Sequence, residues 1–190
     1  DRADRTVISV QTYVGPPAND PGTSDLGTVR PQEAGDYLLS LAAQADGRAG
    51  RDAIMPAMLA DGANTTSRLL EIGRDDTRPR ETRRAALSWL GRSTESEATI
   101  PSNVTSALLQ IARDESDNME VRRHALSVLG RLDHGAGIPP LMELARANMS
   151  GDRTWLSKEA MSALGRSGDP RARDFLRSVV RRDDVADEVL

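Results

Sequence analysis

The residues best able to do chemistry in this 190-residue chain are basic and hydroxyl side chains that recur at fixed spacing. Three segments each carry a base, a serine four residues later and a second base four residues after that. The triplets are Arg84, Ser88 and Arg92; Arg123, Ser127 and Arg131; and Lys158, Ser162 and Arg166. Residues four apart share one face of a helix, so each triplet predicts a basic strip along a helix. Guanidinium and ammonium groups donate to carboxylates and phosphates, so the predicted chemistry is the binding of an anionic surface.

The residues that enzymatic catalysis and metal binding most often need are absent or scarce in this chain. The chain has no cysteine, two histidines and no Gly-x-Ser-x-Gly segment, which removes thiol nucleophiles, a histidine-rich metal site and a hydrolase elbow. His124 follows Arg123 and is interpreted as a surface or groove residue, while Asp133, His134 and Gly135 are interpreted as a loop. We therefore expect no catalytic residue, no cofactor and no metal ligand.

The three triplets belong to an internal repeat. Each ends in Leu-Gly-Arg, at residues 90–92, 129–131 and 164–166, and each follows a second apolar segment ending near residue 74, 113 or 146. A repeat of this length is typical of stacked helix pairs. Within one second helix, Val121, Ala125, Val128 and Leu129 have the spacing of a buried helical face. The glycine in each Leu-Gly-Arg is expected to end its helix with a positive φ.

The repeat divides the chain into a short leading segment and a helical domain. Residues 1–30 are predicted to be extended or looped, with a short β-branched run over residues 6–14. Residues 31–190 are predicted to form units at about 31–62, 63–98, 101–134 and 136–167, with a partial unit over 169–190. In that last unit, residues 183–190 align with the start of a second helix. Aromatic residues make up 3% of the chain, which also favours close-packed helices over a β-sandwich.

The second helix of the third unit resembles the pattern V-R-x-x-A-x-x-x-L-G of bacterial HEAT-repeat proteins, which include HEAT-like repeats of the PBS-lyase type. Residues 121–130, VRRHALSVLG, fit that pattern throughout. The resemblance covers about residues 31–190 and implies an all-α, right-handed α-solenoid of stacked antiparallel helix pairs. It departs from the family at Asn118 and Pro79, which replace the usual Asp, and at Ser157, which replaces the Arg.

What the resemblance implies about function is a non-enzymatic scaffold that binds another protein. The second helices normally line the concave side of such solenoids, so the predicted contact residues are Arg84, Ser88, Arg123, Ser127, Lys158, Ser162 and Arg131. The expected partner is a protein with an acidic surface; its identity and the oligomeric state stay open. Arg51 occupies the same column in the first unit. A merely solvated basic face is the competing interpretation.

Two further hypotheses remain. One is a nucleic-acid-binding or lyase-type accessory protein, although a net charge of −4 and a pI near 5.3 disfavour nucleic acid. The other is a structural spacer within a longer exported protein. No run of residues is apolar enough to insert in a membrane. The compartment stays open, with an exported bacterial protein slightly favoured over a cytoplasmic one.

Overall fold

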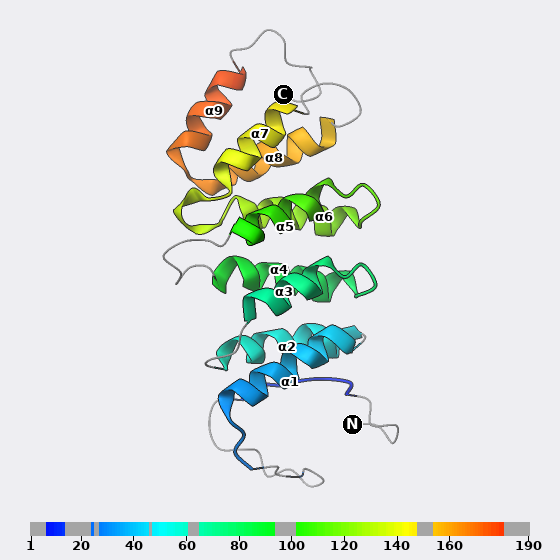
Figure 1. Cartoon of the computed structure of the whole chain (residues 1–190). Helices are drawn as coiled ribbons and strands as arrows, with labels where there is room; N and C mark the ends of the chain where they lie inside the picture. Colours follow the sequence, from blue (N-terminus) through cyan, green and yellow to red (C-terminus); the bar gives the residue numbers. More distant parts are fainter. Residues whose placement is uncertain are drawn as a thin grey trace. The chain divides into compact units, whose positions relative to one another are not determined.

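A computed structural model describes residues 7–13, 24, 27–45, 47–60, 65–93, 102–147 and 154–180 of the chain. Every regular element within these ranges is a helix, and neighbouring helices pack together in chain order (Figure 1). The prediction of an all-α fold built from helix pairs, as in an α-solenoid of HEAT-like repeats, is confirmed. The handedness of the solenoid stays a prediction. The helices divide between two compact units, 1–89 and 90–190.

The first unit holds two helix pairs. They are α1 (Pro31–Gln44) with α2 (Gly47–Leu59), and α3 (Thr65–Arg74) with the greater part of α4 (Arg80–Ser93). Helix α1 begins with Pro31 in its first turn, where the missing N–H has no helical acceptor to lose. Leu39, Ile54 and Leu87 are fully buried, so aliphatic side chains at the predicted helical spacing form this core.

The second unit continues with α5 (Ser102–Arg113), α6 (Met119–Leu129), α7 (Ile138–Ala147), α8 (Thr154–Ser167) and α9 (Pro170–Val180). A short 3₁₀ turn, Asp133–Gly135, separates α6 from α7. The largest fully buried side chains here are again aliphatic: Leu108, Leu126, Leu129, Ile138, Leu141, Leu144 and Leu164. All of the described helices of both units fall inside the predicted repeats, although the unit boundaries themselves stay a prediction.

The leading segment has little regular structure where it is described. Residues 7–13 form neither helix nor strand, so the β-branched run does not make a strand there. Val7 and Val10 are half-buried, while Ile8 and Tyr13 are exposed. Residues 183–190, which align with the start of another second helix, lie outside the described residues. None of the helices in the described part of the chain combines the length and apolar character needed to span a membrane.

The expectation that the Leu-Gly-Arg glycines end their helices with positive φ is wrong. Gly91 and Gly165 lie inside α4 and α8, and Gly130 follows α6 with φ −66°. In the third of these repeats the positive φ belongs to Gly168, just beyond α8.

Close packing explains two of these glycines instead. A Cβ on Gly91 would lie 3.0 Å from Cγ1 of Val128, and one on Gly130 would lie 2.9 Å from the carbonyl oxygen of Ala163. Both neighbours belong to the second helix of the following repeat, so the missing side chains let successive second helices of this unit approach closely.

Candidate partner-binding face

The turns before α4 and α6 fix where these two second helices start. Asp75 accepts hydrogen bonds from the backbone N–H and the hydroxyl of Thr77, and Asp114 does the same for Ser116. These bonds close tight turns after α3 and α5. Asn118, which replaces the usual Asp, caps α6 by accepting a hydrogen bond from the N–H of Glu120 at 3.0 Å.

The first member of each adjacent pair of basic residues then sets the rotation of the second helix. Arg83 is 2% exposed and donates from Nε to the carbonyl of Gly73 at 3.0 Å; Arg122 is 9% exposed and donates from Nε to that of Ala112 at 3.2 Å. Ser157 keeps the same role, since its hydroxyl donates to the carbonyl of Ala145 at 2.9 Å.

These bonds satisfy carbonyls in the last turn of the first helix, where the carbonyl oxygens have no N–H donors from their own helix. The arginine is a structural residue of each pair, and its substitution by serine in the fourth repeat preserves the bond. From the sequence, this position was noted only as a departure from the family pattern. Its signal was the retained polar character of Arg83, Arg122 and Ser157 at an otherwise apolar helix face.

Turning one basic residue inward places the next one outward. In the first unit, Arg84 and Ser88 on α4 are both half-buried, and Arg84 lies 3.6 Å from the carboxylate of Glu81 on the same helix. In the second unit, Arg123 on α6 and Lys158 on α8 are exposed, as are Arg131 and Ser162, while Ser127 is half-buried. We use the name helix-B face for one set of residues of the second unit: Arg123 and Lys158 on the second helices α6 and α8, with Ser127, Arg131, Ser162 and Arg166 four and eight positions later.

An ion pair not foreseen from the sequence joins α6 to α8. Nε of Arg123 lies 2.8 Å from Oε1 of Glu159, whose side chain is 19% exposed. Lys158, beside Glu159, makes no ion pair within the described part of the chain, and neither does Arg131. Arg166 instead donates to the hydroxyl of Ser162 on its own helix. The helices α6 and α8 therefore pack against each other within the second unit, and Arg123 is occupied by a carboxylate of α8.

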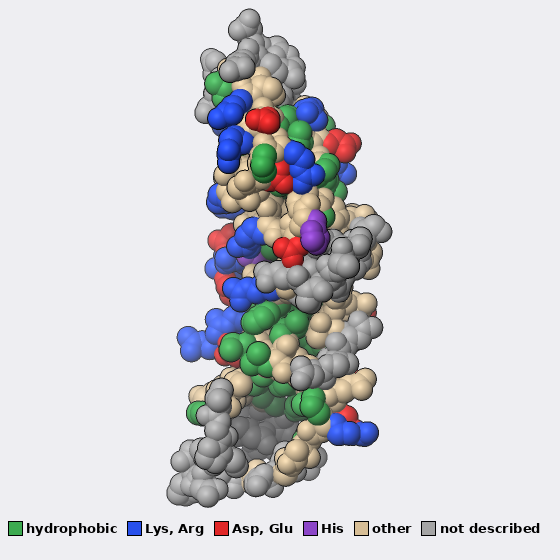
Figure 2. Space-filling view, turned by 90° about the vertical axis from the view of Figure 1, so that its left-hand side faces the viewer, with side chains coloured by type: hydrophobic (Ala, Val, Ile, Leu, Met, Phe, Trp, Pro, Cys, Tyr) green, Lys and Arg blue, Asp and Glu red, His purple; other side chains and the backbone are tan. Residues whose placement is uncertain are grey.

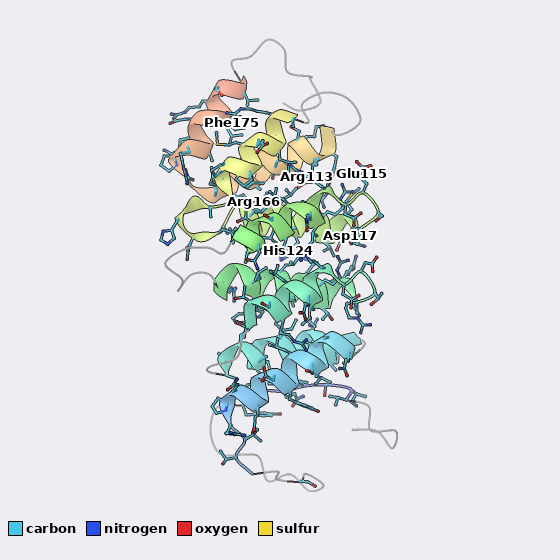
Figure 3. The ribbon with its side chains drawn as sticks, viewed as in Figure 1. Arg113, Glu115, Asp117, His124, Arg166 and Phe175 are labelled. Carbon is cyan, nitrogen blue, oxygen red and sulfur yellow. The ribbon has the colours of Figure 1, made fainter. Side chains whose placement is uncertain are left out.

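The charged side chains of the second unit can be followed in two of the figures. Figure 2 shows blue basic side chains, mixed with red acidic ones, along its left-hand edge at the levels of α6 and α8. Figure 3 places Arg166 at one end of its repeat, whereas Glu115 and Asp117 lie at the opposite end, in the turn between α5 and α6. Arg166 and the acidic turn thus lie at different places in the second unit.

A tryptophan of α8 and the turn between α6 and α7 have structural roles. Trp155 is half-buried, and the guanidinium of Arg122 stacks over its ring at 4.7 Å from the centroid, so it packs between α6 and α8. In the turn at Asp133–Gly135, His134 has φ 53°, and Arg171 donates to the carbonyls of His134 and Gly135 at 3.4 and 3.2 Å.

Arg171 is itself held by Asp169. The hydrogen bond from Arg171 lowers the pKa of the Asp169 carboxyl and raises the pKa of Arg171. This turn therefore links two repeats through the hydrogen bonds of Arg171, and it does not form a histidine–carboxylate pair. His124 is half-buried on α6, and no group of three or more residues able to hold a metal ion occurs among the described residues.

Comparison with known proteins gives one finding. Residues 105–189 match the family model of HEAT repeats. No curated protein and no solved structure matches the chain. The matched range spans α5 to α9, and together with the paired helices it supports a HEAT-repeat protein, a class of helical scaffold often used for protein interaction.

Proposed function

We propose that this chain is a non-enzymatic HEAT-repeat scaffold that binds an acidic surface of a partner protein through its helix-B face. The observation that supports it most strongly is the repetition of exposed bases in equivalent positions of α6 and α8. Copies of a repeat share buried residues because the core requires them. Nothing in the core requires Lys158 or Arg131 to be basic, because both side chains are exposed and neither joins an ion pair in the described residues.

The Arg123–Glu159 ion pair limits which bases of the helix-B face remain uncompensated for a partner. Because Arg123 is already matched by a carboxylate 2.8 Å away, its charge is largely compensated before any partner arrives. Lys158, Arg131 and Arg166 then carry the charge that a partner would meet. The hydroxyls of Ser127 and Ser162 add donors and acceptors between the bases. This favours a partner with several carboxylates spaced along one surface.

Charges arranged in this way determine specificity and association rate more than affinity. Complementary exposed charges steer the encounter, and the steering weakens over a Debye length of about 10 Å at 0.1 M salt. The proposal therefore includes salt-sensitive association. A scaffold role also fits the second unit, whose buried polar side chains Arg122 and Ser157 serve helix packing and leave no polar cluster for catalysis in the described part.

The decisive variant reverses the uncompensated charges. Lys158→Glu/Arg131→Glu changes the net charge by −4 on the helix-B face, and Arg113→Glu/Arg173→Glu makes the same change at exposed bases of the first helices α5 and α9. Partners captured from lysate of the source cells by the wild-type chain should be lost with the first variant and retained with the second. Equal capture by both variants would remove the helix-B face from the proposal.

A further inference from the structure

Helix α9 leaves open two positions that belong to the core in the first helices before it. In α3, α5 and α7 the equivalent residues are buried: Leu69 and Gly73, Leu108 and Ala112, and Leu141 and Ala145. In α9 these positions hold Leu176, which is half-buried, and Val180, which is 70% exposed. The stripe of Ala172, Phe175 and Val179 on the same helix is buried. One side of α9 therefore carries core residues that no described residue fully covers.

An apolar groove lies along this open side of α9. Its volume is about 340 Å³, its walls are almost entirely apolar, and the described residues that line it are Arg173, Leu176, Arg177 and Val180. The first helices α5 and α7 each pack against a second helix, α6 and α8. Among the described residues, α9 has no second helix after it. The groove is therefore placed where the second helix of the next pair would begin.

In each earlier pair, one residue at the start of the second helix reaches the position that Val180 occupies in α9. It donates a hydrogen bond to the carbonyl of that position, and donor and acceptor are ten, ten and twelve residues apart: Arg83 and Gly73, Arg122 and Ala112, and Ser157 and Ala145. The start of a second helix therefore always lies beside this position of the first helix.

Residues 183–190, which lie outside the described residues, supply the next member of this series. Leu190 follows Val180 by ten positions, as the two arginine donors follow their acceptors. Val189 aligns with a residue that is buried at the start of α6 and of α8. The match to the HEAT-repeat family also continues through this segment, to residue 189.

Both partners of this contact change together in the pair that α9 begins. The earlier first helices have glycine or alanine at the position, and the facing residue is arginine or serine. Leu190 cannot donate to a carbonyl. Val180, however, offers apolar side-chain surface that glycine and alanine lack, and covering such surface is favourable. The two residues therefore suit an apolar contact in place of the hydrogen bond.

We infer that residues 183–190 dock in the groove of α9, with Val189 and Leu190 covering Leu176 and Val180, and so close the helix pair that α9 begins. The ten-residue spacing and the matched apolar change select this occupant. The segment begins three residues after the end of α9, so its local concentration at the groove is high. Docking of this segment goes beyond the proposed function, because it involves none of the residues of the helix-B face.

A single cysteine can report on the groove, because the chain has none. Val180→Cys places a thiol in the groove, and Ser178→Cys places a matched thiol elsewhere on α9. Ser178 is exposed, and its equivalents in the completed pairs are exposed as well: Glu71, Gln110 and Glu143. A docked segment should therefore leave Ser178→Cys open. We expect maleimide to label Val180→Cys about tenfold more slowly than Ser178→Cys in the folded full chain.

Val189→Ser/Leu190→Ser tests whether the segment causes the protection, since it removes the apolar side chains without changing the charge. Combined with this variant, Val180→Cys should be labelled about as fast as Ser178→Cys, and the rate at Ser178→Cys and the helical circular dichroism should not change. Equal labelling of the two thiols without the serines, or slow labelling of Val180→Cys that persists with them, would overturn the inference. Protection that rises with protein concentration would also overturn it, because a second copy would then cover α9.

The outcome is separable from that of the proposed function. Lys158→Glu/Arg131→Glu should leave the labelling of Val180→Cys unchanged, because neither residue lines the groove. Loss of partner capture by that variant together with fast labelling of Val180→Cys in the wild-type background would keep the helix-B face and remove only the docked segment.

Discussion

Two neighbouring arginines on α6 have opposite roles, and their substitution separates packing from surface charge. Arg122 is 9% exposed, donates to the carbonyl of Ala112 and stacks on Trp155. Arg122→Ala leaves that carbonyl without its donor and removes the stacking, so we expect a loss of about 2 kcal/mol in the free energy of unfolding, measured in urea.

The control for Arg122→Ala is Arg123→Ala, which removes the same charge one residue along. Arg123 is exposed and pairs with Glu159 across partly solvated surface, so its loss should cost less than about 1 kcal/mol. Arg122→Ser should recover part of the loss, because Ser157 makes the equivalent bond in the next repeat. Equal destabilisation by the two alanine variants would contradict the structural role of Arg122.

Asp75 gives the turn between α3 and α4 a dependence on pH. The hydrogen bond from the Thr77 hydroxyl, helped by the Thr77 N–H and Arg78, lowers the pKa of the Asp75 carboxyl from its ordinary 3.8. A lowered pKa means that the carboxylate stabilises the folded chain above that ordinary value, and that this contribution is lost as the pH falls through the lowered one. Asp75→Asn keeps an acceptor oxygen for Thr77 but cannot titrate. The variant should therefore lose less stability than the wild type between about pH 5 and about pH 3 in urea unfolding.

At the scale of helices, the Leu-Gly-Arg glycines are predicted to respond differently to alanine. Gly130→Ala places a Cβ 2.9 Å from a backbone oxygen, that of Ala163, which cannot move without shifting α8. We expect a loss of about 1–3 kcal/mol. Gly165→Ala meets only Cδ1 of Leu176 at 3.9 Å and lies inside α8, so it should stabilise by about 0.5–1 kcal/mol.

Urea unfolding of the two alanine variants checks the packing explanation directly. Both replace a glycine of the same sequence motif, so a helix-ending role shared by the motif would destabilise both. Opposite signs are expected only if the distance to the neighbouring helix decides the outcome. Stabilisation by Gly130→Ala would show that the second helices are not held close by this glycine.

The helices were predictable because their signals are local. Apolar spacing and the repeated Leu-Gly-Arg predicted paired helices where the structure has α3 to α8. The role of the glycines was not predictable, because close approach depends on a neighbouring helix more than 30 residues away, such as Ala163 for Gly130. The Arg123–Glu159 pair was missed for the same reason, and it changes which bases of the helix-B face meet a partner.

At the scale of the whole chain, charge distinguishes a protein partner from nucleic acid. The net charge is −4 and the pI about 5.3, whereas dedicated nucleic-acid-binding domains are strongly basic. The second unit also carries acidic residues, including Glu115 and Asp117 in the turn between α5 and α6 (Figure 3). A long polyanion such as duplex DNA would be repelled by these carboxylates as well as attracted by the bases.

We therefore expect no measurable binding of a 20-base-pair duplex at about 0.15 M salt, and at most weak binding at lower salt that disappears steeply as salt is added. Each phosphate that the protein neutralises contributes about 0.9 to the slope of log K against log salt, so the slope measures how many bases take part. Fluorescence anisotropy over a salt series provides it, with Lys158→Glu/Arg131→Glu as the control for the face. Tight binding that persists at about 0.15 M salt and is abolished by that variant would show that the helix-B face binds nucleic acid and not a protein partner.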